Sequence, residues 1–349
     1  MKEKSVVVLQ CPKISKSKRC LGNLEPKILT QKKDEIVDGF LICQSCKNKY
    51  PIIQGIPVLL DNLKEYFKDN FVTINDSIGG LEKIHRDLLL YIHALTKANF
   101  NSRTLSPRFF NSGDYENYIS SHYGYGSPKE IHSFLFKCLF KFFLNNNMFK
   151  ILQRWSSKAD RKNSMAIDIG CNVGGYTYFL AQKCVFSYGV DLSYPALFNA
   201  NMIIKNIPCK RDWFLQRQKG RQKRIPMKIK KLENLDFIVA SADNLPFRDG
   251  AFQLSLLGGL IDIAQKKSMI LREAERTLKK KGRVLITFVP FFDKVNLGYK
   301  KSKLTERNIK KLLKKIYIYD TFYTPNISMN ASRFILEEKD NCYMLGIKK

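Results

Sequence analysis

The stretch AIDIGCNVGGYTYFLA, residues 166–181, constrains the fold of this chain more than any other segment. A short apolar run ends in an acid and is followed by a glycine turn and then by a helical pattern. The next segment, FSYGVDLS, is typical of a second buried strand. This order predicts a strand, a helix and a parallel strand, which is the beginning of an α/β domain.

The residues around this turn indicate which small molecule it holds. Asp191 lies 21 positions beyond Gly170 (191 minus 170), close to the ~20-residue offset at which an acid meets a ribose diol in dinucleotide folds. Asn172 stands where a dinucleotide-binding loop needs a bare glycine against the pyrophosphate. S-adenosylmethionine has a ribose but no phosphate, so the asparagine favours that cofactor.

A second signal lies downstream in FIVASADNLPFRDGAFQLSLL, residues 237–257. Asp243 follows a predicted strand, Pro246 and Phe247 turn the chain, and the next strand begins near Phe252. Together with AIDIGCNVGG and VDLS, this arrangement resembles the class I S-adenosylmethionine-dependent methyltransferases, particularly the group that includes quinone-biosynthesis enzymes. The resemblance covers roughly residues 115–349.

The resemblance implies a Rossmann-like α/β fold with a seven-stranded mixed sheet and a role for each motif residue. The glycine turn is expected to wrap the methionine end, Asp191 to hold the ribose and Asp243 to receive the adenine amine. Asp168 is expected to orient the turn or the methionine ammonium. A helix cap at Asp191 and a turn former at Asp243 are the plainer alternatives. The cofactor-binding residues are then Asp168, Gly170, Asn172, Gly174, Asp191, Leu192, Asp243 and Asn244.

The later segments agree with this fold. ILREAERTLKKKGRVLITF predicts a helix, a glycine turn and a strand, and RFILEEKDNCYMLGIKK predicts a terminal hairpin. After the fourth strand the chain reads LLGGLIDI, without the Asn/Asp-Pro-Pro-aromatic turn of amino methyltransferases of adenine and glutamine. Asp262 is the one nearby candidate for a general base, and capping of the next helix is its more probable role. Proximity and in-line alignment can suffice for methyl transfer without a base.

Four of the nine cysteines crowd the first 46 residues. Cys43 and Cys46 form a Cys-x-x-Cys pair, and Cys11 with Cys20 forms a wider local pair. Four thiolates without a histidine favour a closed structural zinc site over a catalytic one. Four thiols without a metal are the alternative.

The segment CQSCKNKYPIIQGIPVLL, residues 43–60, resembles the small zinc-ribbon-like activator proteins that pair with RNA and protein methyltransferases. That resemblance covers residues 5–62 and implies a possible protein partner for the N-terminal region. The order of an N-terminal zinc knuckle followed by a methyltransferase fold is also similar to that of bacterial guanine methyltransferases of the large ribosomal RNA. The expected units are a zinc-ribbon-like domain at 1–62, a helical connector or lid at 63–150 and the methyltransferase domain at 151–349.

The formal net charge of +29 on 349 residues suggests a polyanionic partner such as RNA. Residues 209–231 are strongly basic and contain a tryptophan and a phenylalanine, which suits either nucleic-acid binding or a solvated surface insertion. The helical connector favours a small acceptor, so RNA and a small molecule both remain open as acceptors. An inactive RNA-binding or activator module is the third possibility.

The chain has no run of about 18 apolar residues and no secretory signal, so we expect a cytoplasmic protein without a transmembrane segment. Helical spacing of apolar residues at 78–98 and 128–149 predicts two helices in the connector.

Overall fold

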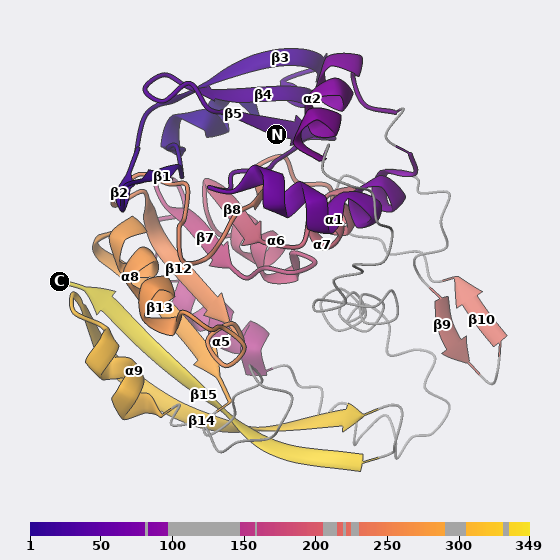
Figure 1. Ribbon diagram of the computed structural model, residues 1–349. Helices are drawn as coiled ribbons and strands as arrows, with labels where there is room; N and C mark the ends of the chain where they lie inside the picture. Colours follow the sequence, from indigo (N-terminus) through magenta and orange to yellow (C-terminus); the bar gives the residue numbers. More distant parts are fainter. Residues whose placement is uncertain are drawn as a thin grey trace.

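The computed structural model describes residues 1–80, 83–96, 147–157, 159–204, 215–218, 221–224, 230–289, 305–330 and 335–349. Its largest element is a seven-stranded sheet in the order β11-β8-β7-β12-β13-β15-β14 (Figure 1). The strands are β7 (Met165–Ile169), β8 (Phe186–Asp191), β11 (Leu235–Val239), β12 (Phe252–Gly258), β13 (Leu278–Phe288), β14 (Ile316–Asn330) and β15 (Ile335–Lys348). The first five run parallel, and β15 and β14 are antiparallel to their neighbours. The predicted fold class is therefore confirmed.

Helices cover both faces of this sheet, which explains why its central strands are mainly apolar. Leu285 of β13 packs in a cluster with α5 (Asn147–Ser156) and with Leu180 of α6 (Gly175–Ala181). Val284 and Ile286 point to the opposite face, where α8 (Lys267–Thr277) and α9 (Glu306–Leu312) supply the partners. α7 (Tyr194–Ile204) packs beside β11. The parallel strands therefore end at one common edge, where the connecting turns gather.

The N-terminal region forms a second, antiparallel sheet in the order β3-β4-β5-β6. Its strands are β3 (Leu24–Lys32), β4 (Glu35–Cys43), β5 (Lys49–Ile53) and β6 (Ile56–Pro57), preceded by the 3-10 helix η1 (Glu3–Val8) and the small hairpin of β1 (Ile14–Ser15) and β2 (Lys18–Arg19). Just after β6, Val58 pairs in parallel with Val239 of β11, and the Leu59 amide donates to the Val239 carbonyl at 2.8 Å. Apolar residues of both regions share one core. The two sheets thus meet at the β11 edge.

Three local predictions differ from the structure. The helix expected at 78–98 is interrupted, because α1 (Leu63–Ile78) ends at the left-handed Gly79 and α2 (Arg86–Thr96) begins later. The expected glycine turn before the fifth strand is wrong. β13 starts at Leu278, and residues 279–282 form a bulge between the paired residues Leu278 and Arg283. Residues 335–348 form one long strand, whose hairpin partner is the preceding β14.

Most of the second connector helix, expected at 128–149, lies outside the described residues. Among the helices that the structure does describe, none combines the length and the apolar character needed to cross a membrane.

Candidate cofactor site and cysteine cluster

The turn between β7 and α6 is built from backbone conformations that favour glycine. Gly170, Asn172 and Gly174 all have left-handed φ angles, of 78°, 49° and 76°. A Cβ on Gly174 would lie 2.5 Å from the Phe237 ring, so this position excludes any side chain. The Gly170 and Cys171 amides donate to the Val190 carbonyl at 2.8 and 3.0 Å, which ties the turn to the end of β8.

Asp191 at the end of β8 joins this turn to the next one. One carboxylate oxygen accepts the Asn172 amide at 2.9 Å, and the other accepts the Ser193 amide at 2.9 Å. Burial raises the pKa of Asp191, and these backbone amides offset part of that effect. Leu192 follows with its side chain 46% exposed, and its carbonyl accepts from the Tyr66 hydroxyl of α1 at 2.9 Å. The structure therefore brings Asn172, Asp191 and Leu192 together.

Asp168 lies deeper, on β7, and is 1% exposed. The Thr177 hydroxyl of α6 donates to its carboxylate at 2.8 Å. Burial raises the pKa of Asp168 to about 7, with the Thr177 hydrogen bond acting in the opposite direction. Asp168 thus fixes the first turn of α6, and through it the glycine turn.

The loop after β11 holds Asp243 and Asn244. Asp243 accepts a short hydrogen bond from the Ser241 hydroxyl and forms an ion pair with Lys266 at 2.8 Å. Burial opposes ionisation, but Lys266 and Ser241 outweigh it and lower the pKa of Asp243. The Asn244 side-chain amide donates to the Pro12 carbonyl at 2.8 Å. Asn244, which is part of the predicted cofactor loop, therefore also contacts the N-terminal region.

Asp262 is buried between β12 and α8, at 5% exposure. The expectation that it caps the next helix is wrong, because the N-cap of α8 is Lys266, which makes no side-chain capping bond. Three residues separate Asp262 from Lys266, so Asp262 lies in a separate turn.

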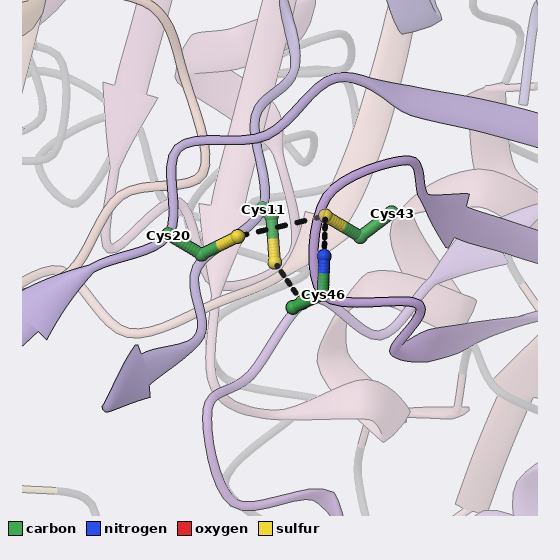
Figure 2. A group of neighbouring side chains, drawn as sticks. All are labelled: Cys11, Cys20, Cys43 and Cys46. Carbon is green, nitrogen blue, oxygen red and sulfur yellow. Dashed lines mark hydrogen bonds between the residues drawn. The ribbon is translucent and has the colours of Figure 1, made fainter.

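The four N-terminal cysteines converge, as Figure 2 shows. Their sulfur atoms all lie within 4.8 Å of one another, with Cys11 to Cys46 at 3.5 Å and Cys20 to Cys43 at 3.6 Å. Four sulfurs that are each about 2.3 Å from a tetrahedral zinc are about 3.8 Å apart. The donor set and its spacing therefore fit one zinc ion.

The residues around the cysteine cluster are closely packed. A Cβ on Gly22 would lie 2.6 Å from the Cys43 sulfur, and the Tyr50 hydroxyl lies 3.0 Å from the Cys11 sulfur. Burial raises the pKa of Cys11. Burial also opposes ionisation of Cys43, but amide donors from Cys46 and Ser45 outweigh it and lower its pKa to about 7. The two backbone amides thus favour the thiolate form of Cys43, which is the form that binds a metal.

Sequence reasoning missed the residues that connect these two sites. The Arg19 guanidinium donates to the Leu245 carbonyl at 2.8 Å and to Glu273 at 2.6 Å. Glu273 in turn accepts the Leu245 amide at 2.8 Å. Arg19 and Pro12 each adjoin a cysteine of the cluster, Cys20 and Cys11. Their position next to a cysteine is the one signal that the sequence offers, because the residues that they contact lie more than 200 positions away.

The basic segment 209–231 lies largely outside the described residues. Within it the structure describes only strands β9 (Leu215–Gln218) and β10 (Arg221–Arg224), which pair as a separate antiparallel hairpin, and residues 230–231.

Comparison with known proteins shows a similarity over the segment that holds the glycine turn. Residues 167–286 match the family model of the methyltransferase domain. This segment contains the glycine turn, Asp191 and the loop of Asp243. The match covers about a third of the chain and shows that this segment is similar to methyltransferase domains.

Individual relatives are distant. An uncharacterized protein of Methanocaldococcus jannaschii, MJ1123, is 29% identical over 62 residues, which are 18% of this chain and 30% of that protein. The match thus spans under a third of this curated relative.

Three solved structures are similar to parts of this chain. MccD protein is 16% identical with a TM-score of 0.44, over 58% of this chain and 97% of that one. PH0226 protein from Pyrococcus horikoshii is 15% identical with a TM-score of 0.43, over 69% and 100%. A chain from the complex between the Haloferax volcanii Trm112 methyltransferase activator and a methyltransferase candidate is 12% identical with a TM-score of 0.41, over 61% and 95%.

Proposed function

We propose that this protein is an S-adenosylmethionine-dependent methyltransferase with a structural zinc ion in its N-terminal region. The observation that carries the proposal is the left-handed turn Gly170–Asn172–Gly174, locked to Asp191 through the Asn172 amide at 2.9 Å. It lies within the segment that matches the methyltransferase domain family, which implies this methyl donor.

The polar atoms around the turn fit the cofactor. The side-chain oxygens of Asn172 and Asn244 are buried and have no hydrogen-bond partner in the described structure, and such groups are costly unless a ligand satisfies them. In this proposal Asn172 and Gly174 enclose the methionine end. Asp191 accepts from the ribose hydroxyls, and Leu192 lies beside them.

Asp243 would receive the adenine amine while it keeps Lys266 as its counter-ion, and Asn244 would lie next to it. The bound cofactor supplies an electrophilic methyl group. The role of the chain is to hold that group in line with the acceptor and to exclude water, and these need no ionisable base. Asp262 stays a weak candidate for a base, now without a competing capping role.

The zinc ion would be held by Cys11, Cys20, Cys43 and Cys46. With four thiolates and no open position, it would serve the fold and take no part in methyl transfer. Its location suggests what it stabilises. Cys11 and Cys20 flank the segment that contains Pro12 and Arg19. The Pro12 carbonyl accepts from Asn244, and the Arg19 guanidinium donates to the Leu245 carbonyl, so both contacts hold the 241–248 loop. We therefore infer that the N-terminal region keeps the adenine-binding loop in position.

The acceptor stays open between RNA and a small molecule. The direct test of the donor is isothermal titration calorimetry of S-adenosylmethionine with wild type and Asp191→Ala. Loss of a charged acceptor costs about 1.5 to 3 kcal/mol, so we expect a loss of affinity of about tenfold or more.

A matched control is Asp160→Ala, which removes an exposed acid remote from the glycine turn. This variant should bind like wild type. If the wild type does not bind S-adenosylmethionine, the proposed enzymatic function is refuted and an RNA-binding or activator module is supported instead. Transfer of labelled methyl groups from the cofactor into fractionated cell extract would then identify the acceptor class.

A further inference from the structure

The register of three neighbouring strands brings lysines to one corner of the large sheet, at the C-terminal end of β15. They are lysines 279–281 in the bulge of β13, 314–315 just before β14, and 348–349 at the end of β15. The Lys349 amide donates to the Lys315 carbonyl at 2.9 Å, and the Lys348 ammonium donates to the Leu278 carbonyl at 2.5 Å. We call this surface the basic corner.

The positive charge of the basic corner is poorly balanced. Within the described part of the chain, none of these lysines forms an ion pair. Glu275, the buried acid nearby, accepts the amides of Lys314, Lys315 and Ile316 at 2.7 to 3.2 Å. Asp249 is paired with Arg276 at 2.7 Å. Burial and the charge of Lys315 lower the pKa of Lys348, and the charges of Asp249 and Glu275 offset only part of that effect. The corner therefore offers unneutralised charge to a polyanion.

Two exposed aromatic rings lie among these charges. Tyr317 is 58% exposed and Tyr319 is 38% exposed. The Lys349 ammonium lies 5.8 Å from the centre of the Tyr317 ring. Arg283 adds a further charge, since it stands opposite Ile347, which stands opposite Tyr317. Exposed rings beside ammonium groups suit a ligand that alternates flat bases with phosphates.

Other polyanionic surfaces fit less well. A helix or patch that binds a membrane presents large apolar side chains such as Leu, Phe or Trp beside its lysines. Here the neighbouring Ile316 is buried at 8% exposure, and the exposed rings are tyrosines. Double-stranded RNA keeps its bases stacked inside the helix, where the tyrosines could not reach them.

We propose that the basic corner binds single-stranded RNA, with the lysines on phosphates and Tyr317 and Tyr319 stacked on bases. The corner lies near the start of β13, while the cofactor turns lie at the carboxyl ends of the strands. Lys281 lies seven positions before Phe288 on β13, which is about 23 Å along the sheet. The corner is thus an anchor remote from the reacting atom. Its part in methyl transfer rests on the proposed function, but its binding can be measured separately.

The test is fluorescence anisotropy of the full-length protein with a labelled 20-nucleotide oligouridine RNA over a range of salt concentrations. Lys279→Gln/Lys280→Gln/Lys281→Gln should weaken binding about tenfold near physiological salt. It should also reduce the slope of log affinity against log salt by about 2, at about 0.7 for each lost contact with a single strand. Tyr317→Ala should weaken binding about fivefold or more, and Tyr317→Phe should restore it because the ring remains.

The matched control is Lys27→Gln/Lys32→Gln/Lys33→Gln, which removes three exposed lysines from the β3–β4 hairpin. Equal weakening in the two triple variants would overturn the proposal, because the affinity would then follow net charge alone. So would a corner variant that loses only its binding to phosphatidylserine vesicles. Calorimetry with S-adenosylmethionine separates the two proposals. RNA binding without cofactor binding would support the RNA anchor and contradict the proposed methyltransferase function. Cofactor binding without RNA binding would contradict the anchor only.

Discussion

The cysteine cluster and the glycine turn are two candidate sites built in opposite ways. The cluster consists of side chains whose sulfurs converge from two distant loops, and each would repel the others as a thiolate without a cation. The turn consists of backbone, already held by the Val190 carbonyl and the Asp191 carboxylate. A site of the first kind depends on its ligand for its geometry, whereas a site of the second kind is formed before the ligand arrives.

The largest expected effect comes from breaking the cluster. Cys43→Ser should abolish zinc binding. Metal binding contributes on the order of 10 kcal/mol to folding in small zinc domains, so we expect the melting temperature to fall by about 10 °C or more. Metal analysis and thermal unfolding measure both quantities.

Cys184→Ala is the matched control, because Cys184 is a buried thiol outside the cluster. It should keep its zinc. Cys11→Ser should behave like Cys43→Ser, and a Cys11 variant with full metal content would show that the first cysteine pair is wrongly assigned.

The second effect comes from breaking the turn. Gly174→Ala would place a methyl group 2.5 Å from the Phe237 ring at a φ of 76°. Strain and overpacking together should cost about 3 kcal/mol or more in the free energy of unfolding, and cofactor affinity should fall with it. Urea unfolding and calorimetry report the two losses.

Gly259→Ala isolates the strain from the clash. Gly259 has a φ of 65°, but a Cβ there would meet nothing within 4 Å. It should cost about 1 to 2 kcal/mol. Equal losses in the two variants would mean that the contact with Phe237 is unimportant.

The smallest effect should come from the link between the regions. Arg19→Ala removes the hydrogen bond to the Leu245 carbonyl and the ion pair with Glu273. Since the loop keeps its other contacts, including that of Arg276 to the same carbonyl, we expect cofactor affinity to fall about three- to tenfold, which is less than the ~1.5 to 3 kcal/mol expected for a charged hydrogen bond to the cofactor itself. The zinc content should not change.

Arg248→Ala is the control for Arg19. The Arg248 side chain also bridges the regions, through the Val7 carbonyl and Asn23, each at 2.8 Å, but it leaves Leu245 untouched. Affinity should stay within about twofold of wild type. If both variants lower the cofactor affinity equally, the contact between the two regions matters in general and the Arg19 hydrogen bond has no specific role.

The sequence predicted local features well because their causes are local. The apolar runs of β7 and β8, the glycine turn and the Cys-x-x-Cys turn each depend on a few neighbouring residues. Asp262 was misread because capping depends on where α8 begins, and α8 begins five positions later, at Lys267. The bulge at 279–282 depends on pairing with β12, so a glycine alone suggested a turn.

The connecting contacts could not be predicted. Lys266 as the partner of Asp243, and Arg19 as the partner of Leu245 and Glu273, depend on tertiary packing across 23 to 254 residues of chain. Arginines and lysines are so abundant here that none of them stands out by type.

The pairing of Val58 with Val239 has a consequence for synthesis on the ribosome. The N-terminal region is made first, but its partners on β11 and in the 236–248 segment emerge some 180 to 230 residues later. At about 5 to 20 residues per second, this leaves a delay of roughly 10 to 45 s. During that interval Leu9 and Leu59, which are fully buried in the finished protein, have no apolar surface of β11 or Phe247 to cover them. The nascent N-terminal region therefore keeps these apolar side chains exposed until residues 236–248 have left the tunnel.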